Sequence, residues 1–185
     1  MIYKHMYIGY NPQKDIVIKG GNRAYTATVK YYENYALLYF ESKDASTNAD
    51  DVAEGTLMPF PDGRKWFEMA EIFHYFAPET DDQWVRKIEN KECKIRVNRL
   101  ERDKIASYIY YHVEHQNDNQ VDEDKFFSIF IYDNLIFIYN EVPEEKITWA
   151  EIEGKNHHGD RYDWEALMDE HFMSWPDGTK GWREL

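Results

Sequence analysis

Two side chains that can donate or exchange protons stand four residues apart, at Tyr108 and His112. A helix is predicted around them, from Asp103, a residue type that favours the N-cap, to about Gln116. Residues four apart lie on the same face of a helix. Because a histidine has an ordinary pKa of about 6.5 and exchanges protons near neutrality, His112 is the candidate acid-base catalyst. Tyr108 is then the candidate residue for hydrogen bonding to a ligand.

The same helix contains an apolar repeat that predicts its buried side. Ile105, Ile109 and Val113 recur every four residues and mark the expected buried stripe. Tyr108 and His112 lie along the edge of that stripe, so both are expected to approach a sheet. A histidine at a helix edge is more often a hydrogen-bonded packing residue than a catalyst, and packing is the alternative role for both side chains.

A metal site is another alternative use of the histidines. His112 and His115 are three residues apart on the predicted helix, and His157 and His158 are adjacent in a polar stretch. No cysteine pair or His-Glu-x-x-His motif accompanies them, and a zinc site usually takes three or four protein ligands. We therefore predict no metal ion and no other cofactor.

Two aromatic-rich stretches align without a gap, TATVKYYENYALLYFE at 26–41 and FFSIFIYDNLIFIYNE at 126–141. Both have β-branched and aromatic runs around a polar pair that ends in Asn34 or Asn134. Asparagine tolerates the positive φ that a two-residue hairpin turn requires. Each stretch is therefore predicted to form a β-hairpin.

A second matched pair follows in the same order, LMPFPDGRKWFE at 57–68 and FMSWPDGTKGWRE at 172–184. The Pro-Asp-Gly tripeptide predicts a turn, and the aromatic residue that follows, Trp66 or Trp182, is expected to anchor the turn to a core. Two matches in the same order indicate a tandem duplication, in which the second copy has extra polar residues at 152–164.

Three further strands are predicted, at 1–10, at 69–76 and at 91–100. Residues 12–21 contain a proline, two glycines and a β-branched pair, so no long helix is expected in the first copy. Each copy otherwise follows the order of a ferredoxin-like unit, with helices on one face of an antiparallel sheet. The predicted class is α+β, with a first module at 1–88 and a second at 89–185.

These motifs resemble the L-rhamnose mutarotase family, small proteins of the dimeric α/β-barrel type in which two ferredoxin-like sheets pack face to face. The helix at 103–116 resembles the family's first helix, in which a tyrosine is followed four residues later by the histidine assigned as proton donor. The hairpin at 126–141 is similar to the family's hairpin. Residues 65–76, KWFEMAEIFHYF, resemble its Trp-rich segment and closing strand.

The resemblance implies an isomerase that interconverts the anomers of a pyranose, with an L-rhamnose-like sugar as substrate. It assigns the proton-transfer role to His112 and sugar binding to Tyr108, Trp182 and Trp66. Mutarotation needs one group that protonates the ring oxygen and another that takes the proton of the anomeric hydroxyl. Core packing is the alternative role for Tyr108 and Trp182.

Three departures from the family limit this expectation. Phe127 takes the place of the substrate-binding tyrosine of the hairpin and cannot donate a hydrogen bond. Gly181 precedes Trp182 where the family has paired tryptophans, and the first copy has no equivalent of Tyr108 and His112. At most one site is therefore expected, in the second module. The chain is expected to be a monomer, because the duplication supplies both sheets.

Charge and composition suggest a compartment and a rival function. The 35 acidic and 22 basic side chains give a formal net charge of -13, which opposes binding to nucleic acid. The sequence has no apolar run long enough to span a membrane, no signal segment and a single cysteine, Cys93, which favours a reducing cytoplasm. The rival function is a non-catalytic acidic interaction protein, an inhibitor or immunity-type partner that binds a basic protein.

Overall fold

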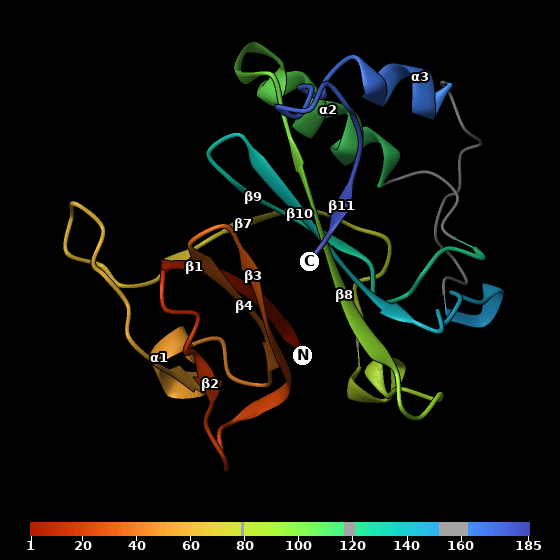
Figure 1. Ribbon diagram of the computed structural model, residues 1–185. Coiled ribbons are helices and arrows are strands. Elements are labelled where there is room, and N and C mark those ends of the chain that lie inside the picture. Colours follow the sequence, from red (N-terminus) through yellow and green to blue (C-terminus); the bar gives the residue numbers. More distant parts are fainter. Residues whose placement is uncertain (79, 117–120, 152–162) are drawn as a thin grey trace. The chain divides into compact units, whose positions relative to one another are not determined.

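The computed structural model describes residues 1–78, 80–116, 121–151 and 163–185 (Figure 1). The chain forms two compact units, the first made of Met1–Ala70, Pro78–Trp84 and Leu185, and the second of Glu71–Ala77 and Val85–Glu184. The described residues form three open sheets of mostly antiparallel strands, with few helices. The predicted α+β class with antiparallel sheets is confirmed.

The first unit contains a four-stranded sheet in the order β3-β4-β1-β6. Its strands are β1 (Tyr3–Tyr10), β3 (Ala24–Tyr32), β4 (Tyr35–Ser42) and β6 (Phe67–Glu68). The other elements are β2 (Val17–Ile18), which pairs with β5 (Ala53–Glu54), the short helix α1 (Ala49–Val52) and the 3-10 turn η1 (Asp81–Trp84). As predicted, residues 12–21 contain no helix. Leu38, Phe40, Val52 and Trp66 are buried together in the core.

The second unit contains a five-stranded sheet in the order β11-β8-β10-β9-β7 (Figure 1). Its strands are β7 (Ala70–His74), β8 (Glu92–Arg99), β9 (Ser128–Tyr132), β10 (Leu135–Val142) and β11 (Arg183–Glu184). Its helices are α2 (Ile105–His115) and α3 (Trp164–Asp169), and its 3-10 turns are η2 (Arg102–Lys104) and η3 (Trp149–Glu151). Tyr108 of α2 and Met168 of α3 share a core with Ile129 and Ile138, so both helices cover the same sheet face.

Both predicted hairpins form, as β3-β4 and as β9-β10. The positive φ angles of their turns are at Glu33 (52°) and Asp133 (54°), so the assignment of that role to Asn34 and Asn134 is wrong. The Asn134 side chain instead donates a hydrogen bond to the carbonyl oxygen of Leu100, at 3.0 Å. The asparagine therefore fixes the hairpin tip to the end of the neighbouring strand.

The two Pro-Asp-Gly segments form turns with the same hydrogen bonds, as predicted. Gly63 N–H donates to the Phe60 carbonyl at 2.8 Å, and Gly178 N–H donates to the Trp175 carbonyl at 2.8 Å. The glycines have φ angles of 87° and 83°, in the left-handed region that favours glycine. A two-residue strand follows each turn, β6 beside β1 and β11 beside β8. The strand order β3-β4-β1-β6 is thus repeated as β9-β10-β8-β11.

The strand predicted at 69–76 exists as β7 but does not close the first sheet. It lies at the edge of the second unit's sheet, beside β9. Phe73 of β7 is 2% exposed and packs in the same core as Tyr108 and Ile129. The burial of this aromatic side chain against the second unit explains the difference from the predicted arrangement.

Helix α2 begins two residues later than predicted and buries a different face. It starts at Ile105 after the turn η2, and Asp103 does not cap it. Val113, predicted to be buried, is 51% exposed, whereas Tyr108 and His112 are 1% and 4% exposed. Each step of four residues turns a helix about 40° beyond a full circle, so a strict four-residue repeat drifts away from the sheet. Tyr108 and His112 therefore lie at the centre of the buried face, not at its edge.

We expect Phe73→Ala to destabilise the second unit by about 3 to 5 kcal/mol, because a buried aromatic ring leaves a cavity. The matched control is Val113→Ala at an exposed position of α2, which we expect to change the unfolding free energy by less than about 0.5 kcal/mol. Urea unfolding curves provide the measurement. Equal stabilities of the two variants would show that β7 does not pack as described.

Candidate functional site

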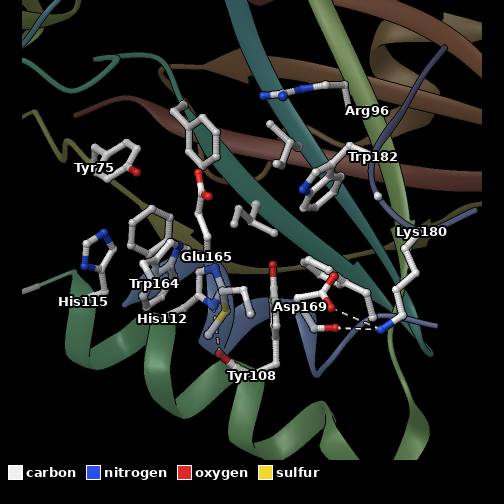
Figure 2. Close-up of a pocket in the computed structure, with 17 residues that line it drawn as sticks. Tyr75, Arg96, Tyr108, His112, His115, Trp164, Glu165, Asp169, Lys180 and Trp182 are labelled. Carbon is white, nitrogen blue, oxygen red and sulfur yellow. Dashed lines mark hydrogen bonds and ion pairs between the residues drawn. The ribbon is translucent and has the colours of Figure 1, made fainter. Parts of the chain in front are cut away.

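A pocket of about 430 Å³ lies in the second unit between the sheet and the two helices (Figure 2). The sheet contributes Arg96, Ile129 and Ile138, while α2 and α3 contribute side chains from the opposite side. The segment before β11 contributes Trp182. Apolar walls with a few polar groups are typical of small-molecule sites.

Three of the four predicted site residues line this pocket, namely Tyr108, His112 and Trp182. The fourth, Trp66, is 8% exposed and belongs to the core of the first unit. A Cβ atom at Gly9 would come within 2.8 Å of the Trp66 ring, so glycine is needed for this close packing. Trp66 thus has a packing role in the first unit.

The imidazole of His112 is held in one orientation by its own helix. Its Nδ1–H donates to the carbonyl oxygen of Tyr108 at 2.9 Å, which leaves the Nε2 lone pair as a hydrogen-bond acceptor. Burial lowers the pKa of His112 to about 4, and the electrostatic effect of the nearby His115 and His171 acts in the same direction. The sequence predicts proton exchange near neutrality, whereas in the structure His112 is neutral at pH 7 and presents Nε2 as a hydrogen-bond acceptor.

Tyr108 provides a neutral donor beside this acceptor. Burial raises the pKa of its phenol above the ordinary value, so the hydroxyl keeps its proton. The hydroxyl points into the pocket (Figure 2) and has no hydrogen-bond partner among the residues that the structure describes. The rings of Tyr108 and His112 are 4.1 Å apart between centroids. Donor and acceptor therefore belong to one small site.

Aromatic side chains that the sequence analysis did not assign to a site form one wall. The ring of Trp164 stacks on His115 with centroids 4.2 Å apart and meets His112 edge-on at 4.9 Å. Phe73 and Tyr75 of the segment that begins with β7 also line the pocket. The pattern WEALMD after Asp163 has the cap and apolar spacing of a short helix and could have indicated α3. Tyr75 and Phe73 had no such signal, because their strand was assigned to the wrong sheet.

The backbone before Trp182 requires the glycine that departs from the family pattern. Gly181 has a φ of 111°, in the region that favours glycine. Its carbonyl oxygen accepts a hydrogen bond from Trp175 Nε1 at 2.8 Å. This contact fixes the segment from which Trp182 reaches the pocket.

Four charged side chains also line the pocket, and two of them form an ion pair. Lys180 Nζ lies 3.4 Å from Asp169 Oδ2. Arg96 and Glu165 form no hydrogen bond or ion pair with any residue in the described ranges. The sequence predicts only that Arg96 lies in a strand, because alternation of charged and apolar residues does not indicate which charges find partners.

Within the described residues, no group of three or more histidine, cysteine or carboxylate side chains could hold a metal ion. His157 and His158, weighed above as ligands, lie outside the described residues. Over the same described part of the chain, no helix is long and apolar enough to cross a membrane.

Comparison with known proteins gives no relative: no family model, no curated protein and no solved structure matches the chain.

The burial of His112 predicts a pH dependence of stability. Because its pKa is about 4 in the folded chain and about 6.5 when unfolded, the unfolded chain binds the extra proton between these values. The contribution of His112 to the free energy of unfolding is fully present above about pH 6.5. It is lost as pH falls toward 4, by up to about 3 kcal/mol. His112→Gln should therefore lose less stability than the wild type between about pH 7 and pH 4.5 in urea unfolding. The same loss in both proteins would contradict the assignment.

Proposed function

We propose that the second unit binds a sugar in this pocket and interconverts its pyranose anomers. The observation that carries the proposal is the pairing of a neutral donor, Tyr108, with a neutral acceptor, His112, in one pocket with aromatic walls. Flat aromatic faces such as that of Trp182 suit the C–H surface of a sugar ring.

The resemblance noted in the sequence adds support. Phe127 and Gly181, which stand where the family has its substrate-binding tyrosine and the first of its paired tryptophans, line the same pocket as Tyr108, His112 and Trp182. These five residues come from three separate segments of the chain. Their convergence is expected if the second unit descends from such a sugar-binding protein.

We also propose that the two units are ferredoxin-like modules that arose by tandem duplication. The support is a set of equivalent hydrogen bonds in the two units. Tyr39 donates to Glu41 at 2.7 Å, and Tyr139 donates to Glu141 at 2.7 Å. The residue after the first strand also bonds to the hairpin tip in both units, from Asn11 N–H to the carbonyl of Asn34 at 2.7 Å and from Leu100 N–H to that of Asn134 at 2.8 Å.

The duplication proposal predicts a monomeric pseudo-dimer. Since one chain would supply both sheets that meet between subunits in the family, sedimentation equilibrium should give a mass near the chain mass of 22.3 kDa. A stable dimer would contradict the pseudo-dimer, though not the repeated strand order.

The proposed chemistry assigns one role to each side chain. Nε2 of His112 accepts the proton of the anomeric hydroxyl, while the Tyr108 hydroxyl gives its proton to the ring oxygen O5 as the C1–O5 bond breaks. The open-chain carbonyl can then turn about C1–C2. When O5 adds to the other face, its proton returns to Tyr108, and the proton held by His112 goes to the new anomeric hydroxyl. This makes His112 the base, where the resemblance implies a proton donor, because its low pKa keeps it neutral.

Saturation-transfer NMR of anomer exchange on a panel of free sugars that includes L-rhamnose tests the proposal. We expect His112→Gln to reduce the acceleration by roughly 10² to 10⁴, and Tyr108→Phe by about tenfold, because it removes one hydroxyl and keeps the ring. The matched control is Tyr110→Phe at an exposed position of the same helix, which should have no effect.

No acceleration of any sugar by folded protein would reject the enzyme. The rival function, an acidic interaction protein, would then be tested by a search for a basic partner, because the net charge of -13 favours such a complex.

A further inference from the structure

Arg96 brings a positive charge into the proposed sugar pocket. It lies in β8, opposite Ile138 of β10, which also lines the pocket. Its side chain is partly buried and makes no hydrogen bond or ion pair with the residues that the structure describes. A guanidinium has five N–H donors in a planar fork that matches a carboxylate or a phosphate.

Three acidic side chains lie opposite Arg96 in the ladder or line the same pocket, and two of them are bound to lysines, while Glu165 of α3 forms no ion pair with the described residues. Glu184 is directly opposite Arg96 in the β8-β11 ladder, but its carboxylate accepts a hydrogen bond from Lys94 at 2.6 Å. Asp169, at the pocket wall, pairs with Lys180 at 3.4 Å. The guanidinium thus remains available to a ligand.

The fold itself does not require an arginine at this position. In the second unit Arg96 is opposite Glu184. The equivalent ladder pair in the first unit is Tyr7 opposite Glu68. Glu68 is bonded to His5 Nδ1 at 2.8 Å, and burial together with the charge of Glu68 raises the pKa of Tyr7, which keeps its phenol uncharged. An uncharged side chain therefore suffices for the same place in a sheet of the same strand order.

A further donor lies at the Arg96 end of the pocket. The Trp182 indole N–H has no hydrogen-bond partner among the described residues, and its side chain lines the pocket. Figure 2 shows Arg96 and Trp182 at one end of the pocket, with Tyr75 and His115 at the other. Unpaired donors at one end favour a ligand group that only accepts hydrogen bonds.

We propose that the ligand of this pocket is an anionic sugar, whose carboxylate or phosphate binds Arg96. This inference rests on the proposed sugar site and names its substrate class. Arg96 would hold the charged group, Trp182 would cover the ring, and the reactive C1 end would lie toward Tyr108 and His112.

The test compares hexuronates with their parent hexoses of gluco, galacto and manno configuration, and with the hexose 6-phosphates. Each pair differs only at C6, so the affinity ratio isolates the charged group. We expect the wild type to bind one acidic sugar at least about tenfold more tightly than its neutral parent in calorimetric titration. Preference for the uronate or for the phosphate identifies which anion the site takes.

Arg96→Gln should weaken binding of the acidic sugar by about 10- to 100-fold and leave the neutral parent nearly unchanged. Arg96→Lys keeps the positive charge but lacks the planar fork of donors, so its affinity for the acidic sugar should lie between those of the wild type and Arg96→Gln. Arg102→Gln is the matched control, because Arg102 is 68% exposed, pairs with Asp133 and does not line this pocket. Circular dichroism establishes whether each variant is folded. If Arg96→Gln does not fold, the affinities of the wild type for the acidic sugar and for its neutral parent still test the proposal.

The outcomes separate the two proposals. Acidic sugars that bind through Arg96 without faster anomer exchange would support the anion site and reject the mutarotase. If neutral sugars bind as tightly as acidic ones and exchange their anomers as fast, and Arg96→Gln changes neither affinity, the anion site would be overturned and the mutarotase would stand. A folded protein that binds no sugar of either kind would overturn both.

Discussion

The hydrogen bond from His112 Nδ1 to the Tyr108 carbonyl, at 2.9 Å, determines the chemistry available in the pocket. Because Nδ1 carries the proton and donates it to the helix backbone, Nε2 is left as a hydrogen-bond acceptor. Burial against the sheet then removes water from the ring and lowers its pKa to about 4. The same packing of α2 keeps both the imidazole and the phenol neutral, so no further residue is needed to set their protonation states.

The frame that supports this helix is a repeated pattern of hydrogen bonds. Glu41 and Glu141 are both buried and both accept from a tyrosine two residues earlier on the same strand. Their remaining bonds differ, since Glu41 accepts from Trp84 Nε1 at 2.7 Å, whereas Glu141 pairs with Arg86 at 2.6 Å. Burial opposes ionisation of Glu141, but the Arg86 hydrogen bond and charge lower its pKa. The buried glutamate at this position of the sheet can therefore have either a neutral or a charged hydrogen-bond partner.

The two units use this frame differently. In the first, Trp66 fills the space beside Gly9 and no helix follows the first strand. In the second, α2 and α3 stand over the sheet and leave a pocket of about 430 Å³. Trp182, which takes the place of Trp66 after the second Pro-Asp-Gly turn, lines that pocket instead of filling a core. This difference between the units is consistent with a site in the second unit.

The sequence alone determined the local elements: two hairpins, two Pro-Asp-Gly turns, the strand before α2 and most of the helix. These depend on side-chain alternation and turn chemistry within a few residues. The tertiary structure decided which sheet receives β7, which face of α2 is buried, and that Arg96 lacks a partner among the described residues while Glu184 bonds to Lys94. It also decided the pKa of His112, because desolvation depends on residues distant in the chain, such as Phe73 and Trp164, that meet only in the folded unit.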